Sequence, residues 1–589
     1  MSHWNLSQFY PNIEAWEEDL KKLPSYIERL ASFKGKLGDF DQFKAFYQTD
    51  EEATHFFYRL FSYIHLASDL NLKDADKMAK NQQIMLKFAE LGQKVSYVNP
   101  EVIALGEEKV MSFLDKDPFL NQYRFPLEKL FAQQAHVLSD DKEGLLANFG
   151  TLRTVPAQLY QALSIVDAKD EEITLSNGEK QLVTLTNYRS LIPTLDKAED
   201  RKKVFEAAFK RFKENKSTFA NIYNLVLLQM KANFKSREYG SALDAALFGN
   251  NIPIDVYKNL MDVAYESNQT VQRYIKLRKK ALGLDEYHTY DRFMTIVKDD
   301  TKYDYETSRK LFFSALEGFD DEYVKNQHEA IEEGYVDVFQ ADGKRNGAYS
   351  SGFYGFHPHI LLNHDDTLDS VFTLVHEAGH SAHTIFANNA QPMATADYVI
   401  FVAEVASTFN EHILLDYLVK HATTSKQKVA LLEKALDGFM ATFIRQTLFA
   451  TYEYKANELV EQGVPITDQA LSQIMIDLYK HYYDLDITKE DGKPYVWAYI
   501  PHLFRTPFYV YQYATSFSAS LKLYDDVKSH KPGAMERYKQ LLKSGGSDYP
   551  VNLLAQAGAD LTDKETFRAV TKRYNLLLDE LEKALDELK

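Results

Sequence analysis

The sequence contains no cysteine among its 589 residues. Disulfides, thiolate nucleophiles and cysteine-ligated zinc or iron–sulfur sites are therefore excluded, and a metal could be held only by histidine and carboxylate side chains. Glycine and proline are also scarce, with 24 and 16 residues, or about 7% of the chain against a usual share of about 12%. So few helix-interrupting residues favour a helical protein over a sandwich, a barrel or a chain with disordered linkers.

Positive charge and long apolar runs are missing as well. Lysine and arginine total 68 against 85 aspartates and glutamates, which gives a net charge of −17. A nucleic-acid or anionic-membrane partner is not expected, because either would need a basic face. No stretch approaches the ~18 continuous apolar residues of a membrane span, and residues 1–5 lack the features of a signal peptide. We therefore expect a cytoplasmic protein, and the sequence does not indicate its oligomeric state.

Most of the chain has the apolar periodicity of amphipathic helices, and two short segments do not. An Asn177-Gly178 pair between alternating apolar residues predicts a β-hairpin near 173–185. The glycine- and aromatic-rich segment from Tyr335 to Asn363 predicts a small sheet. We place a boundary near residue 195, between an N-terminal helical region (1–195) that ends in the hairpin and a second region (196–589). The helical patterns cover 199–238, 255–282, 305–333, 425–463 and 564–588.

The stretch His376-Glu377-Ala-Gly-His380 matches the pattern H-E-x-x-H. The two histidines lie one helical turn apart, so that both imidazoles can reach one metal ion. Glu377 is offset by ~100° around the helix, where a general base for a metal-bound water would lie. A metzincin would need Gly at 383 and His at 386, and the chain has His383 and Phe386, so that class is excluded.

A third ligand is expected from the next predicted helix, roughly residues 398–420. Glu404 lies there among apolar residues, where a carboxylate either becomes neutral or pairs with a cation. If the two helices run antiparallel, their lengths place Glu404 opposite His380. Glu411 shares its face and could support a ligand or compete for the ligand position. The alternative is that Glu404 forms a salt bridge in the core.

An aromatic segment at 494–520 contains His502 and several tyrosines. Histidine N–H and tyrosine O–H groups beside a metal could stabilise the oxyanion that forms when a peptide bond is hydrolysed. An aromatic segment is more often core packing, and the residue pattern alone leaves both interpretations open. The tyrosines in question are Tyr495, Tyr499, Tyr509, Tyr511 and Tyr513.

Three segments in order, 347–384, 404–408 and 501–516, resemble the oligoendopeptidase F branch of the thimet-oligopeptidase-like zinc metallopeptidases. The resemblance covers roughly 200–589, and residues 1–195 look like the more variable N-terminal region of that branch. It implies one Zn²⁺ ion held by His376, His380 and Glu404, with Glu377 activating the water.

The resemblance also implies that His502 and a tyrosine contact the substrate carbonyl or the oxyanion. Tyr509 and Tyr513 are the preferred catalytic tyrosines, with Tyr511 as the alternative or as a substrate contact. The implied fold is mostly α, a large helical ellipsoid with a deep substrate channel and a small sheet beside the zinc-binding helix pair. The edge of that sheet would pair with the substrate backbone. The substrate-binding residues expected in this segment are Gly347, Tyr349 and Tyr354.

The sequence thus predicts a zinc-dependent endopeptidase that hydrolyses internal bonds of short oligopeptides. One alternative is a dipeptidyl carboxypeptidase on a similar scaffold. Another is a catalytically silent helical peptide-binding protein with a structural metal, although structural zinc sites usually have four protein ligands and three are evident here. The ligand set also tolerates Mn²⁺ or Co²⁺.

Overall fold

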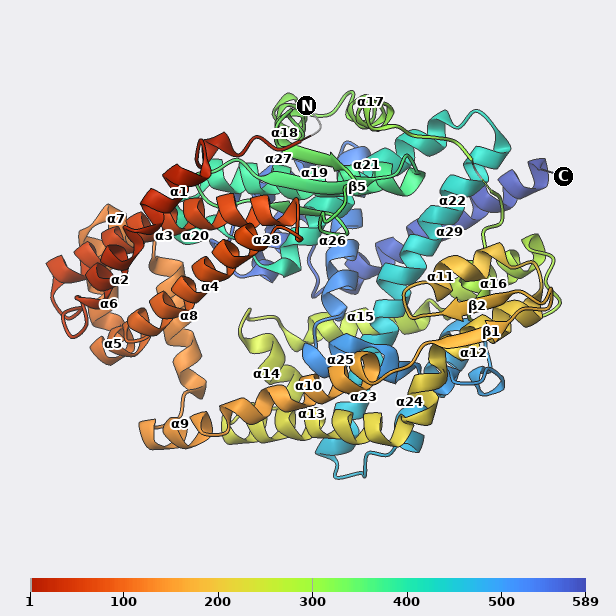
Figure 1. The fold of residues 1–589 in the computed structure, drawn as a ribbon, viewed down its shortest axis with the longest axis horizontal. Coiled ribbons are helices and arrows are strands. Elements are labelled where there is room, and N and C mark those ends of the chain that lie inside the picture. The colour runs from red at the N-terminus through yellow and green to blue at the C-terminus, as the bar shows by residue number, and fades with distance from the viewer. Residues whose placement is uncertain (1–2, 299, 589) are drawn as a thin grey trace. The chain divides into compact units, whose positions relative to one another are not determined.

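The computed structural model describes residues 3–298 and 300–588. Helices make up most of this chain, and the described strands form two small sheets (Figure 1). Contacts define two compact units, each built from three separate stretches of sequence. Unit 1 comprises Met1–Ala135, Thr301–Leu414 and Leu523–Gly558, and unit 2 comprises His136–Asp300, Leu415–Lys522 and Ala559–Lys589. The mostly helical fold class is confirmed, and the boundary near residue 195 remains a prediction.

The N-terminal part of unit 1 is a set of helices around an aromatic core. The longest, α3, begins where the Asp39 side chain accepts a hydrogen bond from the Gln42 amide, which satisfies a free donor of the first turn. Buried indole groups connect distant segments, since Trp16 Nε1 donates to the Leu60 carbonyl at 2.8 Å and Trp4 Nε1 to that of Ile360 at 2.9 Å. The helices are α1 (Ile13–Leu20), α2 (Leu23–Ala31), α3 (Phe40–Asp69), α4 (Ala75–Val95), α5 (Val98–Leu105), α6 (Glu107–Lys116), α7 (Pro118–Asn121) and α8 (Arg124–Gln133).

The second part of unit 1 holds a three-stranded sheet with the order β3-β5-β4. The strands are β3 (Val336–Phe339), β4 (Tyr349–Ser351) and β5 (His359–His364), with β5 parallel to β3 and antiparallel to β4. This is the segment in which the sequence predicts a small sheet. The helix α19 (Leu368–Ala390) packs against β4 and β5 and is buried along most of its length.

Further helices of unit 1 surround α19 (Figure 1). Both α18 and α27 pack against it, so that it lies in the core. The helix α21 contributes its residues up to Leu414 to this unit. The elements are α17 (Tyr305–Ala315), α18 (Asp321–Ala330), α20 (Met393–Ala396), α21 (Ile400–His421), α27 (Ala534–Lys543) and α28 (Pro550–Ala557).

Unit 2 is a helical body with one hairpin, β1 (Glu171–Thr174) and β2 (Lys180–Val183), at the position that Asn177-Gly178 predicts. Its long helical patterns are interrupted, because Asn215 and Ser267 leave the helical conformation and split them into helix pairs. The helices are α9 (Asp140–Ala147), α10 (Val155–Gln161), α11 (Tyr188–Leu191), α12 (Ala198–Glu214), α13 (Lys216–Ser236), α14 (Ala242–Phe248), α15 (Ile254–Glu266), α16 (Asn268–Ala281), α22 (Ser425–Phe439), α23 (Arg445–Glu461), α24 (Asp468–Tyr483), α25 (Pro501–Arg505) and α29 (Lys564–Glu587). The helix α26 (Tyr511–Lys528) belongs to this unit up to Lys522.

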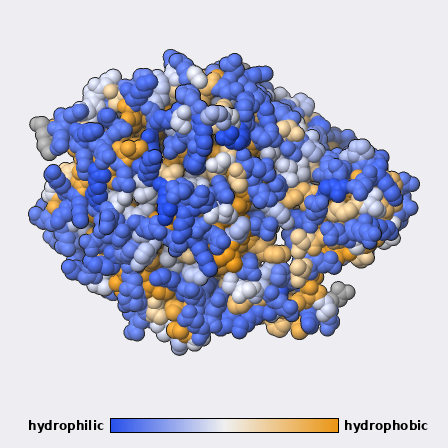
Figure 2. Space-filling model, turned by 180° about the vertical axis from the view of Figure 1, so that it is seen from behind, coloured by the Kyte–Doolittle hydropathy of each residue, from blue (hydrophilic) through white to orange (hydrophobic). Residues whose placement is uncertain are grey.

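Charged and polar side chains cover most of the face drawn in Figure 2, with apolar side chains scattered between them. Within the described ranges, no helix combines the length and the apolar character that crossing a bilayer requires.

Candidate active site

Two helices of unit 1 bring the three predicted metal ligands together. His376 and His380 lie one turn apart on α19, and Glu404 lies on α21. His376 Nε2 is 3.2 Å from His380 Nε2, and Glu404 Oε2 is 3.4 and 3.7 Å from these two nitrogens. These three side chains are the group of described histidine and acidic residues whose geometry suits a metal ion.

The spacing of these atoms suits a tetrahedral ion. A zinc ion bound at ~2.0–2.1 Å holds neighbouring ligand atoms roughly 3.3 Å apart, close to the three separations observed between His376, His380 and Glu404. Two imidazole nitrogens and one carboxylate oxygen are also ligands that zinc accepts readily. The residues present therefore fit a single divalent cation.

Gly379 allows α19 and α21 to approach this closely. A Cβ atom on Gly379 would lie 2.6 Å from the Ala406 carbonyl oxygen and 2.6 Å from the Ser407 Cα. No side chain fits at such distances, so a residue other than glycine would force the two helices apart. The close packing of the two helices thus explains why the H-E-x-x-H pattern has glycine at position 379.

Polar contacts fix the orientation of the two helices. Glu411 Oε1 lies 2.6 Å from His376 Nδ1, on the side of the ring away from the ligand cluster. Asn410 donates from Nδ2 to the Val375 carbonyl at 3.1 Å and accepts a hydrogen bond from the Tyr323 hydroxyl. A carboxylate on the second nitrogen of a ligating histidine sets its tautomer and makes it a better ligand. The structure therefore gives Glu411 a supporting position behind His376.

The two histidines have opposite electrostatic environments. Burial opposes protonation of His376, but its hydrogen bond to Glu411 and the charges of Glu377 and Glu404 raise its pKa to about 9. Burial and the charge of His376 lower the pKa of His380 to about 3. Binding of a cation requires both rings to be neutral, so metal binding at neutral pH would release a proton from His376.

Glu377 lies beside the ligands and is buried, with 7% of its surface exposed. Burial raises its pKa to about 7, with the charge of His376 opposing this rise and that of Glu404 adding to it. The Ser350 backbone on β4 hydrogen-bonds to it, which places Glu377 next to the sheet. A carboxyl group whose pKa is near the working pH can both accept and return a proton.

The expected substrate-binding residues lie around β4, an edge strand of the sheet. Gly347 has a φ of +86° and precedes the strand, and its carbonyl accepts a hydrogen bond from Asn363. Tyr349 is part of β4, and its hydroxyl donates to Asp69 at 2.7 Å. Tyr354 is half-buried in the turn that follows. The structure thus brings this group to one edge of the sheet, beside Glu377.

The aromatic residues expected to contact the substrate belong to unit 2. The rings of His502 and Tyr509 are parallel, with centroids 5.5 Å apart, and Tyr513 meets both at their edges. Burial, together with the charge of Arg505, lowers the pKa of His502. Tyr511 lies elsewhere, with 2% of its surface exposed and its ring 4.9 Å from that of Tyr257. His502, Tyr509 and Tyr513 therefore form one group without Tyr511.

Glu453 on α23 supports this group, and the sequence patterns do not predict this role. Its carboxyl accepts a hydrogen bond of 2.7 Å from the Phe508 amide. Phe508 has a φ of +55°, a left-handed conformation that is unfavourable for a bulky residue. The contact holds the turn that directly precedes Tyr509. A lone acidic residue in the apolar segment 447–453 is the sequence signal that would have indicated it.

The chain is similar to known proteins along its whole length. The family model described as "Peptidase family M3" matches residues 194–572, and that described as "Oligopeptidase F" matches 101–169. Oligopeptidase PepF of Bacillus subtilis is 34% identical over 100% of this chain and 88% of its own, and the group B oligopeptidase PepB of Streptococcus agalactiae is 35% identical over 98% and 96%.

Solved structures give the same result. A crystal structure of a putative peptidase from Chlamydophila abortus has a TM-score of 0.90 and 30% identity, and covers 99% of this chain and 98% of its own. That of oligoendopeptidase-F from Enterococcus faecium has a TM-score of 0.74 and 28% identity, with 97% and 98% covered.

Replacing Gly379 by alanine should loosen the ligand cluster. Because the new Cβ would overlap the α21 backbone, we expect a loss of stability of about 1–3 kcal/mol and weaker zinc binding. Gly92→Ala in α4 is the matched control, since its Cβ meets nothing within 4 Å. Thermal unfolding and zinc titration of both variants test this, and equal behaviour of the two would refute the role of Gly379.

Replacing Glu453 by glutamine should change how stability depends on pH. Burial raises the pKa of Glu453 from 4.5 to about 8, so its contribution is fully present below pH ~4.5 and is lost as the pH rises towards 8. Glutamine can still accept from Phe508 but does not ionise. We therefore expect the variant to gain stability over the parent between pH 5 and pH 8, by on the order of a few kcal/mol.

Calorimetric melting temperatures at pH 5 and pH 8 would measure this difference. Glu214→Gln, at an exposed position at the end of α12, is the control. A difference between parent and Glu453→Gln that stays constant with pH would contradict the buried, protonated state of Glu453.

Proposed function

The chain belongs to peptidase family M3, in its oligoendopeptidase F branch, and we propose that it hydrolyses internal bonds of short oligopeptides with one Zn²⁺ ion as cofactor. It is a metalloendopeptidase by family. The observation that carries the zinc proposal is the convergence of His376, His380 and Glu404 with separations of 3.2–3.7 Å. Three protein ligands leave a coordination position for water or substrate, which is the arrangement of catalytic zinc sites.

A bound zinc ion would lower the pKa of water towards ~7 and polarise a carbonyl group, and both effects promote hydrolysis of an amide. The proposed role of His376, His380 and Glu404 is to hold the ion. Glu411 keeps His376 in the tautomer that presents Nε2 to it, because the other ring nitrogen lies against the Glu411 carboxylate.

Glu377 is the proposed general base and acid. It is adjacent in sequence to a ligand and buried, and its pKa is raised to about 7. A bound cation would lower that pKa and favour the carboxylate, which accepts the proton of the attacking water. The protonated carboxyl can then return the proton to the leaving amine. Because Glu377 both accepts and returns the proton, no second acid is needed in this part of the site.

His502, Tyr509 and Tyr513 are proposed to donate hydrogen bonds to the substrate carbonyl or the oxyanion. The support is their mutual packing and the hydrogen bond from the Phe508 amide to Glu453, which fixes the turn before Tyr509. Donors held in place before the reaction stabilise developing charge without reorganisation. Tyr511 is assigned no donor role, because its ring packs against Tyr257.

The edge of β4 is the proposed site for the substrate backbone. In the order β3-β5-β4 this strand has a pairing partner on one side within the described sheet. An extended peptide could add to the other side by main-chain hydrogen bonds, which are indifferent to side-chain identity. Gly347, Tyr349 and Tyr354 flank that edge. We also propose a cytoplasmic location, as the sequence leads us to expect.

Replacing Glu377 by glutamine should abolish hydrolysis without removing the metal. Loss of the general base should reduce kcat by at least ~10²–10⁴-fold, while metal analysis shows an unchanged zinc content. An internally quenched peptide with blocked ends reports the cut, and mass spectrometry locates it. Glu107→Gln, in the first turn of α6, is the control. Near-parental turnover by zinc-loaded Glu377→Gln protein would refute the mechanism, and failure of the parental enzyme to cut the peptide with blocked ends would refute endopeptidase action.

Replacing Glu411 by glutamine should weaken zinc binding rather than the chemical step. Because Glu411 contacts the far nitrogen of His376, we expect the zinc dissociation constant to rise by ~10–100-fold. At saturating zinc, kcat should recover most of its parental value. Zinc titration against a competing chelator measures the first quantity. An unchanged dissociation constant would show that Glu411 does not support the ligand.

A further inference from the structure

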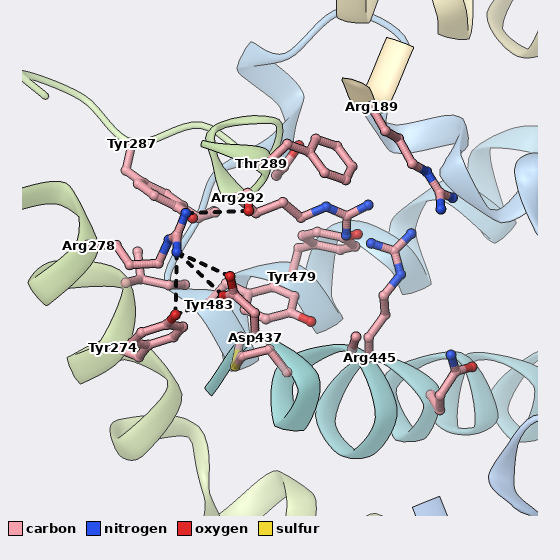
Figure 3. Close-up of a pocket in the computed structure, with 16 residues that line it drawn as sticks. Arg189, Tyr274, Arg278, Tyr287, Thr289, Arg292, Asp437, Arg445, Tyr479 and Tyr483 are labelled. Carbon is pink, nitrogen blue, oxygen red and sulfur yellow. Dashed lines mark hydrogen bonds and ion pairs between the residues drawn. The ribbon is translucent and has the colours of Figure 1, made fainter. Parts of the chain in front are cut away.

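A cavity of about 520 Å³ lies within unit 2, outside the group of His502, Tyr509 and Tyr513. Its walls come from α11, α16, the segment 287–293, the junction of α22 and α23, and α24 (Figure 3). Four arginines reach it, together with several tyrosines. Such a concentration of guanidinium groups is unusual in a chain that carries 85 acidic and 68 basic residues.

One end of the cavity is electrostatically balanced. Arg278 is buried, and its Nη1 lies 2.6 Å from Glu433 and 3.4 Å from Asp437. The Tyr274 hydroxyl donates to Asp437 at 2.8 Å, as the dashed lines in Figure 3 show. The charge of Arg278 is therefore neutralised inside the protein, and this end of the cavity needs no further anion.

The other end carries positive charge without a matching carboxylate. Figure 3 shows the guanidinium groups of Arg189, Arg292 and Arg445 pointing towards one another. Within the described ranges, none of these three has an acidic side chain at ion-pair distance. Arg189 donates to the Tyr188 and Tyr499 hydroxyls, Arg292 lies over the Phe293 ring, and Arg445 lies over the Phe449 ring. We call these three residues the arginine cluster.

A cluster of this kind is suited to an anion. Like charges that converge repel one another, and a bound anion relieves that repulsion. The planar guanidinium group presents paired N–H donors that match a carboxylate in bidentate geometry. The phenol of Tyr479, which also lines the cavity, and the Gln446 amide can supply further donors.

The arginine cluster adjoins the proposed substrate residues. Arg189, Arg445 and Gln446 also line a second cavity of about 390 Å³, whose wall includes His502. An anion held by the cluster would therefore lie next to a cavity whose wall includes a residue that we assign to substrate contact. A substrate that reaches both cavities needs an anionic group for the cluster, and every unblocked oligopeptide carries one, its C-terminal carboxylate, whatever its sequence.

We propose that the arginine cluster binds the C-terminal carboxylate of the oligopeptide substrate. This inference rests on the proposed function and adds a determinant of substrate choice to it. Recognition of the chain end does not depend on the side chains of the peptide. Pairing of the peptide backbone with the edge of β4 does not depend on them either. It would favour peptides that have a free end over internal segments of longer chains.

Matched peptides test the proposal. One internally quenched octapeptide ends in a free carboxylate and its partner ends in a carboxamide. We expect the parental zinc-loaded enzyme to have a KM at least ~10-fold lower for the acid, in line with a charge-assisted hydrogen bond. In Arg445→Gln the KM for the acid should rise to within about twofold of that for the amide, with kcat nearly unchanged.

Two further variants separate charge from folding. Arg445→Lys keeps the charge but loses the guanidinium geometry, so an intermediate preference is expected. Arg568→Gln removes a positive charge at an exposed position of the same unit that pairs with Glu266, and its preference for the acid should equal that of the parent. If Arg568→Gln lost the preference equally, or if Arg445→Gln raised both KM values alike, the assignment to the cluster would be overturned.

A third peptide assigns the carboxylate to the chain end. An octapeptide amide with glutamate as its last residue carries a carboxylate on the side chain only. The proposal predicts that it binds like the plain amide. Recovery of the full affinity of the acid would overturn recognition of the chain end in favour of an acidic side chain.

Binding measured without turnover distinguishes this inference from the proposed function. Calorimetric titration of Glu377→Gln protein with the peptide pair should show tighter binding of the acid, and that preference should vanish when Arg445→Gln is added. Absence of cleavage together with this preference would refute the proposed function and leave the cluster as a carboxylate site. Cleavage of both peptides with equal KM and equal affinity would refute the cluster alone.

Discussion

The contact between the backbones of α19 and α21 at Gly379 is the constraint on which the candidate metal centre depends. Helix axes usually lie 8–10 Å apart because side chains separate them. Here the Ala406 carbonyl and the Ser407 Cα occupy the space that a Cβ would need. The short separation brings the Glu404 carboxylate to the two histidines. The same alignment of the two helices places Glu411 against His376 Nδ1 and lets the Asn410 amide donate to the Val375 carbonyl.

At this short distance between the helices, the carboxylates of the site need a positive charge nearby, and a cation can provide it. Glu377, Glu404 and Glu411 surround two imidazoles in a partly buried region. Carboxylates in such a setting are costly unless a positive charge compensates them. In the free protein, protonation of His376 supplies part of that charge, as its raised pKa indicates. A divalent ion would supply more of that charge, and it would replace the proton on His376.

The sequence predicts those parts of the site in which local spacing determines geometry. His376 and His380 share a helix face because they are four residues apart, and the Asn177-Gly178 turn fixes its hairpin in the same way. The position of Glu404 opposite His380 could be predicted because the short connection between their two helices favours an antiparallel arrangement. The presence of a small sheet before α19 also follows from local composition.

Other parts depend on contacts that no local pattern encodes. The choice among the tyrosines after His502 depends on the left-handed turn at Phe508, which redirects the chain before α26 and sends Tyr511 into the core. Glu453 stabilises that turn from a helix more than fifty residues earlier. The arginine cluster takes its members from three segments that are far apart in sequence, so their convergence is visible only in the fold. The two units cannot be predicted from local patterns either, because each combines three stretches that are far apart in sequence.

That discontinuity has a consequence for how the protein is made. The helix α27, which packs against α19, belongs to unit 1 but is encoded after residue 522. A nascent chain that already contains His376, His380 and Glu404 still lacks this covering helix, although two of the three stretches of unit 2 are synthesised before it. The ligand-bearing helix thus acquires its full packing only late in translation, when nearly the whole polypeptide has left the ribosome. Ribosome-bound intermediates would carry the metal ligands without the completed core that holds them in place.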